Sequence, residues 1–207
     1  MKVVMLNGSP NKHGCTYTAL NIIAKELAAQ GIESEILWLG NGLVRGCIGC
    51  GGCKTAEKCV FFDDPINGIG EKLKHADGYV FGAPVHYSSP NGAMISAMDR
   101  LFYAFGKYMQ LKPAAAVVSA RRAGTTASFD VLNKYIQINN MITVPSTYWN
   151  MVHGNKPEEV LQDEEGVSIM RAIGSNMAWL LKVLNKVSHT QLEKPVEIPK
   201  VRTNFIR

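Results

Sequence analysis

The sequence predicts an α/β fold in which helices cover both faces of a five-stranded parallel sheet. Short apolar runs alternate along the chain with longer segments of helical periodicity. Two of those runs, at 78–82 and 114–119, are almost continuous in apolar residues. Strands that are buried on both faces have this composition, whereas strands with a solvated face alternate apolar and polar residues. The strand order expected for such a doubly wound sheet is 2-1-3-4-5.

The alternation places each element in turn. The strands are expected at 2–6, 34–39, 78–82, 114–119 and 142–149, and the helices at 16–30, 65–75, 91–105, 125–138 and 166–187. In the first helix Leu20, Ile23 and Leu27 share one face, and Gly31 stands where a left-handed residue commonly ends a helix. We expect one domain over 1–187, because a single core serves a chain of this size. A Gly- and Cys-rich insertion at 40–64 and a tail at 188–207 lie outside the pattern.

Composition and charge exclude several classes of protein. The 207 residues are 46% hydrophobic and 19% charged, and no apolar run reaches the roughly 20 residues that span a bilayer. The net charge of +5 comes from scattered side chains, not from the dense basic patch that nucleic-acid binding needs. The first strand runs directly into Asn7-Gly8-Ser9-Pro10, which leaves no room for a signal peptide. With five cysteines, an odd number, we expect a cytoplasmic protein whose thiols serve metal or redox chemistry.

A polar loop connects the first strand to the first helix. It reads Asn7-Gly8-Ser9-Pro10-Asn11-Lys12-His13-Gly14-Cys15-Thr16-Tyr17-Thr18. Hydroxyls, amides and free N–H groups at a helix N-terminus attract a phosphate, and open α/β sheets bind ligands at the carboxyl ends of their strands. The alternative is an ordinary turn in which Thr16 caps the helix. The loop is longer than capping requires, which favours the phosphate site.

Three segments together resemble a known family. The first loop resembles the Gly-Ser-Pro-x-x-x-Gly-x-Thr signature of the flavodoxin-like NAD(P)H-dependent FMN reductases and of the iron–sulfur flavoproteins allied to them. The segments 83–92, which leads to Asp99-Arg100, and 119–126 agree with this family in order and position. The resemblance covers essentially the whole chain. It implies a flavodoxin-like fold, FMN as the cofactor and NAD(P)H as the electron donor.

By this resemblance each segment has its own part in binding FMN. The residues implied to line the phosphate are Ser9, Asn11, Cys15, Thr16 and Thr18; those flanking the flavin are Pro84, His86, Tyr87, Ser88, Asn91 and Gly92; and those forming a third wall are Ser119, Arg122, Gly124 and Thr125. Many relatives have Arg where this chain has Asn11, and Asn or Ser where it has Cys15. A thiol at a helix N-terminus favours its thiolate, and the alternative for Cys15 is a small residue that fills a tight turn.

Aromatic and imidazole side chains are expected over the flavin. The candidates for catalytic contact are His86, Tyr87 and Trp149, with Asn150 and His153 close to Trp149 in the sequence. Aromatic rings there would stack on a nicotinamide or a quinone; a core or interface position is the alternative for Trp149. Because flavin carries the difficult chemistry, no acid or base is strictly required. The chain shows neither a nucleophile elbow nor a histidine–carboxylate motif that would suggest a hydrolase.

Four cysteines stand close together in the insertion. Cys47, Cys50, Cys53 and Cys59 form a C-x2-C-x2-C-x5-C run among glycines. The run resembles that of the iron–sulfur flavoproteins, in which such cysteines ligate a [4Fe–4S] cluster; tetrahedral zinc and metal-free thiols are the alternatives. Because the segment after the second strand leaves the sheet at the same edge as the phosphate loop, we expect these cysteines close to the flavin.

Three classes of function follow. The first is an FMN-dependent oxidoreductase that passes electrons from NAD(P)H to a quinone, a flavin or a similar small acceptor. The second is an iron–sulfur flavoprotein that takes electrons from a ferredoxin-like donor, and the third is a non-enzymatic FMN-binding module. Relatives are commonly dimers or tetramers, so we expect a homodimer or homotetramer. The expected oligomerisation arm is the tail, with its apolar residues Val196, Ile198, Val201, Phe205 and Ile206.

Overall fold

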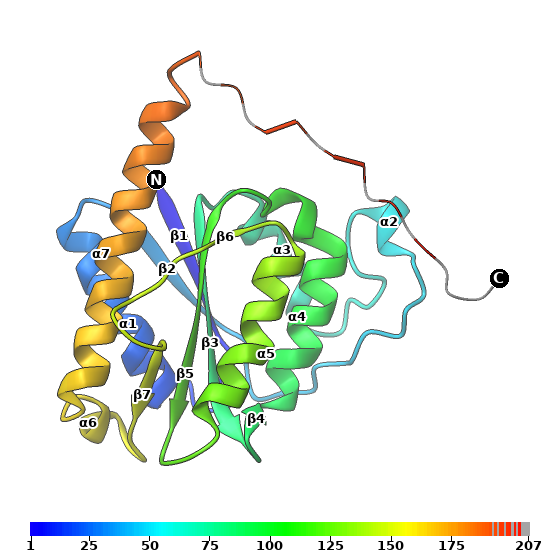
Figure 1. Cartoon of the computed structure of the whole chain (residues 1–207). Helices are drawn as coiled ribbons and strands as arrows, with labels where there is room; N and C mark the ends of the chain where they lie inside the picture. The colour runs from blue at the N-terminus through cyan, green and yellow to red at the C-terminus, as the bar shows by residue number, and fades with distance from the viewer. Residues whose placement is uncertain (192, 194, 197, 200, 202, 204–207) are drawn as a thin grey trace.

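The main path of the sheet runs in the order β2-β1-β3-β5-β6 (Figure 1). Its strands, which pair in parallel, are β1 (Lys2–Asn7), β2 (Glu33–Trp38), β3 (Gly78–His86), β5 (Pro113–Ala120) and β6 (Ile142–Thr143). Along this path the strands follow the expected 2-1-3-4-5 order of a flavodoxin-like fold. The structure is a computed structural model that describes residues 1–191, 193, 195, 196, 198, 199, 201 and 203.

Short strands beside this path make the sheet seven-stranded within the described part of the chain, so the expectation of five strands is wrong. β4 (Ser89–Pro90) pairs antiparallel with the end of β3. β7 (Met151–His153) pairs in parallel with the end of β5, beyond the point where β6 stops.

The expected strand at 142–149 is wrong in its second half, because residues 144–150 leave the sheet between β6 and β7. Pro145 has no N–H to give to a strand ladder. The side chain of Asn150 instead donates to the carbonyl of Ala116 on β5 at 3.0 Å, where a continuous strand would have placed a backbone donor. The chain can therefore bulge outward without leaving that carbonyl unpaired.

Helices cover both faces of the sheet, as expected (Figure 1). On one face lie α1 (Cys15–Ala29) and α7 (Glu164–Val187), and on the other lie α3 (Ile66–Lys74), α4 (Gly92–Phe105) and α5 (Thr125–Ile138). The pleat of β1 divides the core between them, since Met5 belongs to the buried cluster on the side of α1 and α7, whereas Leu6 belongs to the cluster on the side of the other three. Short elements complete the described fold: α2 (Cys53–Ala56), α6 (Pro157–Val160) and a 3-10 turn, η1 (Gly106–Tyr108).

The two segments outside the regular pattern behave differently. The insertion leaves β2, runs beside α4 and forms α2 (Figure 1). The tail lies partly outside the described residues, which omit Phe205 and Ile206, while Val196, Ile198 and Val201 are exposed. Among the helices of the described chain, we find none with the length and apolar character needed to cross a membrane.

Candidate functional site

The loops that follow β1, β3 and β5 come together at the carboxyl edge of the sheet. Asn91 donates from Nδ2 to the carbonyl of Gly8 at 2.8 Å, which joins the first two loops. Gly124 of the third loop lies so close to the second that a Cβ there would stand 2.6 Å from the Cα of Ser88. The structure thus brings the three predicted segments together.

Hydrogen bonds within the first loop hold it in shape. The N–H of Ser9 donates to Asn7 Oδ1 at 3.1 Å, and the N–H of Asn11 donates to Ser9 Oγ at 3.2 Å. Helix α1 begins after Gly14, and no side chain of a described residue caps it. The first N–H groups of α1 therefore remain available, and together with the helix dipole they attract an anion. The alternative in which Thr16 caps an ordinary turn is wrong.

The side chains at the start of α1 point in different directions. Thr16 is buried, and its hydroxyl lies 2.8 Å from Ser119 Oγ at the end of β5. The hydroxyl of Thr18 donates back to the carbonyl of the N-cap residue at 3.2 Å. Cys15 donates from Sγ to the carbonyl of Gly154 at 3.4 Å, and burial raises the pKa of its thiol. This raised pKa argues against a thiolate and favours the alternative in which Cys15 fills a tight turn.

The second loop begins as a tight hairpin between β3 and β4. His86 pairs with Ser89 across it, and the residues between them, Tyr87 and Ser88, have positive φ angles of 49° and 59°. Residues other than glycine rarely adopt this backbone conformation, because it costs about 1–3 kcal/mol for each residue. Such strained residues are found mainly at functional sites. Tyr87 is fully exposed at the tip, with His86 and Ser88 exposed beside it.

Asn91 ends the second loop and keeps one acceptor free. Its N–H donates to the carbonyl of the half-buried Pro84 at 3.1 Å. Its Oδ1 is buried and has no hydrogen-bond partner among the described residues. Because buried polar atoms are almost always paired, an unpaired one beside a candidate site points to a missing ligand or water. Gly92 follows in an exposed position at the start of α4, which no described side chain caps.

The third loop turns sharply from β5 into α5. Gly124 has a φ of 91°, a conformation that suits glycine, and it touches the second loop where a Cβ would not fit. Ser119 and Thr125 are buried on either side of the turn, whereas Arg122 is exposed. A side chain at position 124 would push the second and third loops apart.

The segment before β7 presents two aromatic rings to solvent. Tyr148 and Trp149 are 53% and 50% exposed, and their ring centroids lie 4.7 Å apart. The core alternative for Trp149 is therefore wrong. Asn150 is buried and bonded to β5, and it accepts from Ser146 Oγ at 2.7 Å, so its side chain is already engaged within the fold. The backbone N–H of His153 donates to Asp163 Oδ2 at 2.7 Å.

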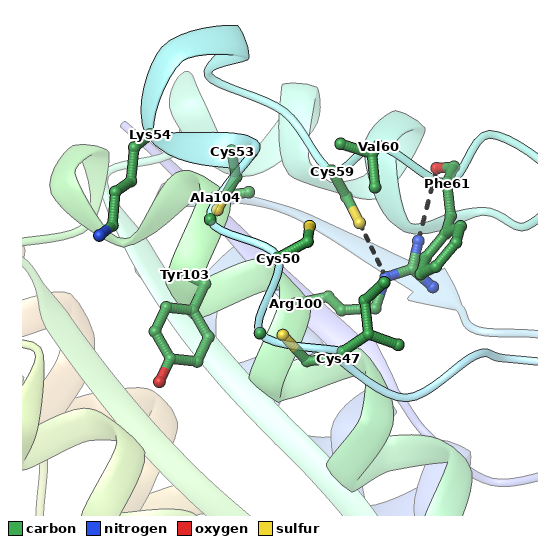
Figure 2. A pocket seen from close by; sticks show the side chains of 13 residues that line it. Cys47, Cys50, Cys53, Lys54, Cys59, Val60, Phe61, Arg100, Tyr103 and Ala104 are labelled. Carbon is green, nitrogen blue, oxygen red and sulfur yellow. Dashed lines mark hydrogen bonds between the residues drawn. The ribbon is translucent and has the colours of Figure 1, made fainter.

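The cysteines of the insertion surround a separate pocket of about 510 Å³, and Figure 2 shows Cys47, Cys50, Cys53 and Cys59 around it. Cys47 and Cys50 are exposed, Cys53 and Cys59 are half-buried, and all four have free thiols. Burial raises the pKa of the Cys53 thiol, and the other three cysteines, which line the same pocket, raise it further. Within the described residues, no three Cys, His, Asp or Glu side chains are grouped so as to hold a metal ion.

Polar side chains outside the predicted site residues anchor this cysteine loop. Arg100, inside α4, pairs with the carboxylate of Asp64, and both side chains are 1% exposed. The same guanidinium donates from Nε to Cys59 Sγ at 3.1 Å (Figure 2). Asn67 of α3 accepts from the N–H of Cys59 at 2.8 Å. The sequence signal for Arg100 is its place on a face of α4 that is otherwise apolar, between Ala97 and Ala104.

The cysteine pocket is displaced from the carboxyl edge, contrary to expectation. It is lined by Arg100, Tyr103 and Ala104 of α4, whereas the three loops meet the start of that helix at Asn91. A helical rise of 1.5 Å per residue places Arg100 about 13 Å further along the axis than Asn91. The insertion leaves β2 at the expected edge but then follows α4 away from it (Figure 1). Although the insertion starts at the same edge of the sheet, its cysteines therefore do not lie beside the three loops.

Comparison with known proteins identifies the family. Residues 1–156 match the family model described as NADPH-dependent FMN reductase. The chain belongs to this family. It is similar to iron–sulfur flavoproteins of Methanocaldococcus jannaschii (29% identity over 194 residues, covering 90% of this chain and 100% of the relative) and Archaeoglobus fulgidus (31% over 170 residues, 80% and 83%). A flavodoxin structure from the domain Archaea matches with a TM-score of 0.61 at 15% identity, over 88% of this chain and 99% of the flavodoxin.

As a member of the FMN reductase family, this protein is a flavin-dependent oxidoreductase with a flavodoxin-like fold. FMN fits the residues of the carboxyl edge. The uncapped N-terminus of α1 suits its phosphate, and the unpaired Oδ1 of Asn91 offers an acceptor to its donor groups. The exposed hairpin with Tyr87 leaves the neighbouring surface open to a second reactant.

Proposed function

We propose that this protein uses FMN to pass electrons from NAD(P)H to a quinone, a flavin or a similar small acceptor. The observation that carries the proposal is the open carboxyl edge, where the uncapped N-terminus of α1 and the exposed hairpin of His86 and Tyr87 belong to adjoining loops. When bound, FMN accepts a hydride and releases electrons singly or in pairs. The description of the family names NADPH as the donor, which supports the same assignment.

The residues around the carboxyl edge have distinct parts in this reaction. The N–H groups of α1, with the hydroxyls of Ser9 and Thr16 and the exposed side chain of Asn11, hold the phosphate. Asn91 orients the flavin through its free Oδ1. Tyr87 and Trp149 present exposed rings on which a flat donor or acceptor stacks in turn, and His86 contacts the same reactant beside Tyr87.

We assign the four cysteines of the pocket to a [4Fe–4S] cluster. Two relatives that span most of the chain are iron–sulfur flavoproteins, and thiolates are the usual ligands of such clusters. All four cysteines line one pocket of about 510 Å³, which supports the assignment.

A second candidate function is electron transfer from a ferredoxin-like protein. The observation that favours it is the exposure of the cysteine pocket, since Ile48 and Tyr103 on its lining are 67% and 73% exposed. A partner protein can reach this pocket without covering the loops of the carboxyl edge. The free thiols of all five cysteines suit a reducing compartment, and we place the protein in the cytoplasm.

An anaerobic comparison of two electron donors tests the proposal. The FMN-loaded protein is mixed with NADPH or NADH in one arm and with reduced ferredoxin in the other, and the visible flavin absorption is followed. Bleaching by the nicotinamide, with turnover when a quinone or free flavin is added, supports the reductase. Bleaching by reduced ferredoxin alone replaces it with the second function. Bleaching by neither donor contradicts both.

Replacement of Cys50 and Cys53 by Ser tests the cluster. The double variant should lose bound iron and slow flavin reoxidation by a one-electron acceptor. Replacement of the nearby Lys54 and Lys58 by Ser is the matched control, because it alters the same loop without removing a sulfur. If iron content, FMN content and reoxidation rate all match the parent protein, the loop is a structural insertion and the cluster assignment is wrong.

A further inference from the structure

Arg100 is a buried cation that donates hydrogen bonds to an acid, to the backbone carbonyls of Arg45 and Phe61, and to a sulfur. Its NH1 and NH2 groups both donate to Asp64, with NH2 at 3.0 Å from Oδ1. NH1 also donates to the carbonyl of Arg45 at 3.2 Å. The remaining donor, Nε–H, points to Cys59 Sγ at 3.1 Å (Figure 2). A guanidinium held in this way at both NH groups cannot turn its Nε–H elsewhere.

This contact makes Cys59 unlike the other cysteines of the pocket. Among the described residues, Cys47, Cys50 and Cys53 receive no side-chain hydrogen bond at sulfur, whereas Cys59 receives one from a cation. The backbone of Cys59 is also held on both sides by Asn67, which accepts from its N–H at 2.8 Å and donates to its carbonyl at 3.0 Å. Cys59 is therefore the most firmly placed of the four sulfurs.

A hydrogen bond to a ligand sulfur acts on the redox behaviour of an iron–sulfur cluster. The sulfur carries more negative charge when the cluster is reduced, so a donor aimed at it stabilises the reduced state and raises the reduction potential. Asp64 balances the charge of Arg100, and both side chains are buried. The effect on the cluster therefore depends on the directed N–H group more than on a net positive charge.

We propose that Arg100 is a positioning residue that, through its Nε–H···Sγ bond to Cys59, raises the reduction potential of the cluster held by the four cysteines. Asp64 fixes the guanidinium that makes this bond. The inference rests on the proposed cluster and adds to it an unequal role for one ligand. It also explains why a charged residue occupies the apolar face of α4.

The experiment compares Arg100→Lys with Arg45→Lys after anaerobic reconstitution with iron and sulfide. Lysine keeps the charge but has no planar Nε–H to aim at Cys59. Arg45→Lys alters an exposed arginine of the same loop, which pairs with Asp63 and gives its backbone carbonyl, not its side chain, to Arg100. Iron per chain and the midpoint potential are measured for the parent and both variants.

A shift to a more negative potential in Arg100→Lys alone, with iron retained, is the expected result. An unchanged potential in Arg100→Lys, or an equal shift in Arg45→Lys, overturns the inference but leaves the cluster assignment intact. A parent protein that takes up no cluster overturns both.

A spectroscopic measurement on the parent protein decides the matter if Arg100→Lys does not fold. The reduced cluster is examined by pulsed electron paramagnetic resonance in protein made with isotopically labelled arginine. A coupling between the cluster and an arginine nitrogen is expected from the Nε–H···Sγ bond. A cluster signal without such a coupling overturns the inference.

Discussion

At the level of single residues, bonds within the protein hold the polar groups of the carboxyl edge in place. Ser9 Oγ accepts from the N–H of Asn11, and the hydroxyl of Thr16 lies 2.8 Å from that of Ser119. Groups that are fixed before a ligand arrives lose little further freedom when it binds. The first loop is therefore organised for an anion, and removal of its hydroxyls should be measurable as a loss of cofactor affinity.

Replacing Ser9 and Thr16 together by Ala should weaken FMN binding. A hydrogen bond to a charged group contributes about 1.5–3 kcal/mol, so the loss of two corresponds to about a hundredfold or more in affinity. Fluorescence titration of the apoprotein with FMN measures this affinity. The control is Ser188→Ala with Thr190→Ala, which removes two hydroxyls beyond the last turn of α7. Equal FMN affinity in the two double variants would show that the first loop does not hold the phosphate.

Tyr79 should make stability depend on pH in alkaline solution. Its buried hydroxyl donates to the carbonyl of Leu73 at 3.0 Å, and burial raises the pKa of the phenol above its ordinary value of 10.0. The stabilisation is complete below pH 10.0 and is lost as the pH rises toward the higher pKa of the folded state, because the unfolded chain ionises first. Denaturant unfolding should show a steeper loss above that pH in the parent protein than in Tyr79→Phe.

The same experiment has a simple control and a clear contrary result. Tyr79→Phe should also cost about 1 kcal/mol at neutral pH, through the lost hydrogen bond. Tyr103→Phe removes a hydroxyl from a tyrosine that is 73% exposed and should preserve the alkaline slope. Parallel curves for the parent and Tyr79→Phe across the alkaline range would contradict the assignment.

The sequence indicated the site residues that lie in local motifs and missed those that depend on packing. The cysteine run and the loop from Ser9 to Thr18 are continuous in the chain, so their chemistry can be read from spacing. The pair of Arg100 and Asp64 joins residues 36 positions apart, and only the packing of the insertion on α4 brings them together. The free Oδ1 of Asn91 depends in the same way on three converging loops.

At the level of elements, two glycines of α3 should respond to alanine in opposite ways. A Cβ at Gly70 would stand 2.1 Å from a ring carbon of the buried Phe105 on α4, whereas a Cβ at Gly68 meets nothing within 4 Å. Gly70→Ala should therefore destabilise the protein by about 1–3 kcal/mol through overpacking. Gly68→Ala should stabilise it by up to about 1 kcal/mol through helix propensity.

Thermal or urea unfolding of both variants provides the measurement, and each variant is the control of the other because they alter the same helix. If Gly70→Ala is as stable as Gly68→Ala, α3 and α4 do not pack as closely as described.

The boundaries of elements were predictable where local patterns agreed with packing. The helix expected at 125–138 has these bounds in α5, and α3 begins and ends within one residue of expectation. The strand expected at 142–149 failed because its apolar character does not show that Asn150 would bond β5 through its side chain. A side chain that replaces a backbone donor leaves no periodic signal in the sequence.

For the protein as a whole, we expect a homodimer or homotetramer that depends on the tail. Val196, Ile198 and Val201 are 84–87% exposed, and apolar side chains in this number favour burial against another surface. Light scattering at low concentration should report a multiple of 22.7 kDa. A chain truncated before Ser188 should form an assembly of fewer chains. A 22.7 kDa particle would rule out assembly, and a truncated chain that still assembles would exclude the tail from it.

The central claim is that the three loops of the carboxyl edge form one FMN site. Titration of the apoprotein with FMN, followed by the change in flavin fluorescence, tests it most directly. We expect saturation at one FMN per chain, with binding lost in Gly124→Val, because a side chain there would force the second and third loops apart. A circular dichroism spectrum of the variant checks that the fold is retained. No saturable binding by the parent protein, or unchanged affinity in the folded Gly124→Val variant, would contradict the claim.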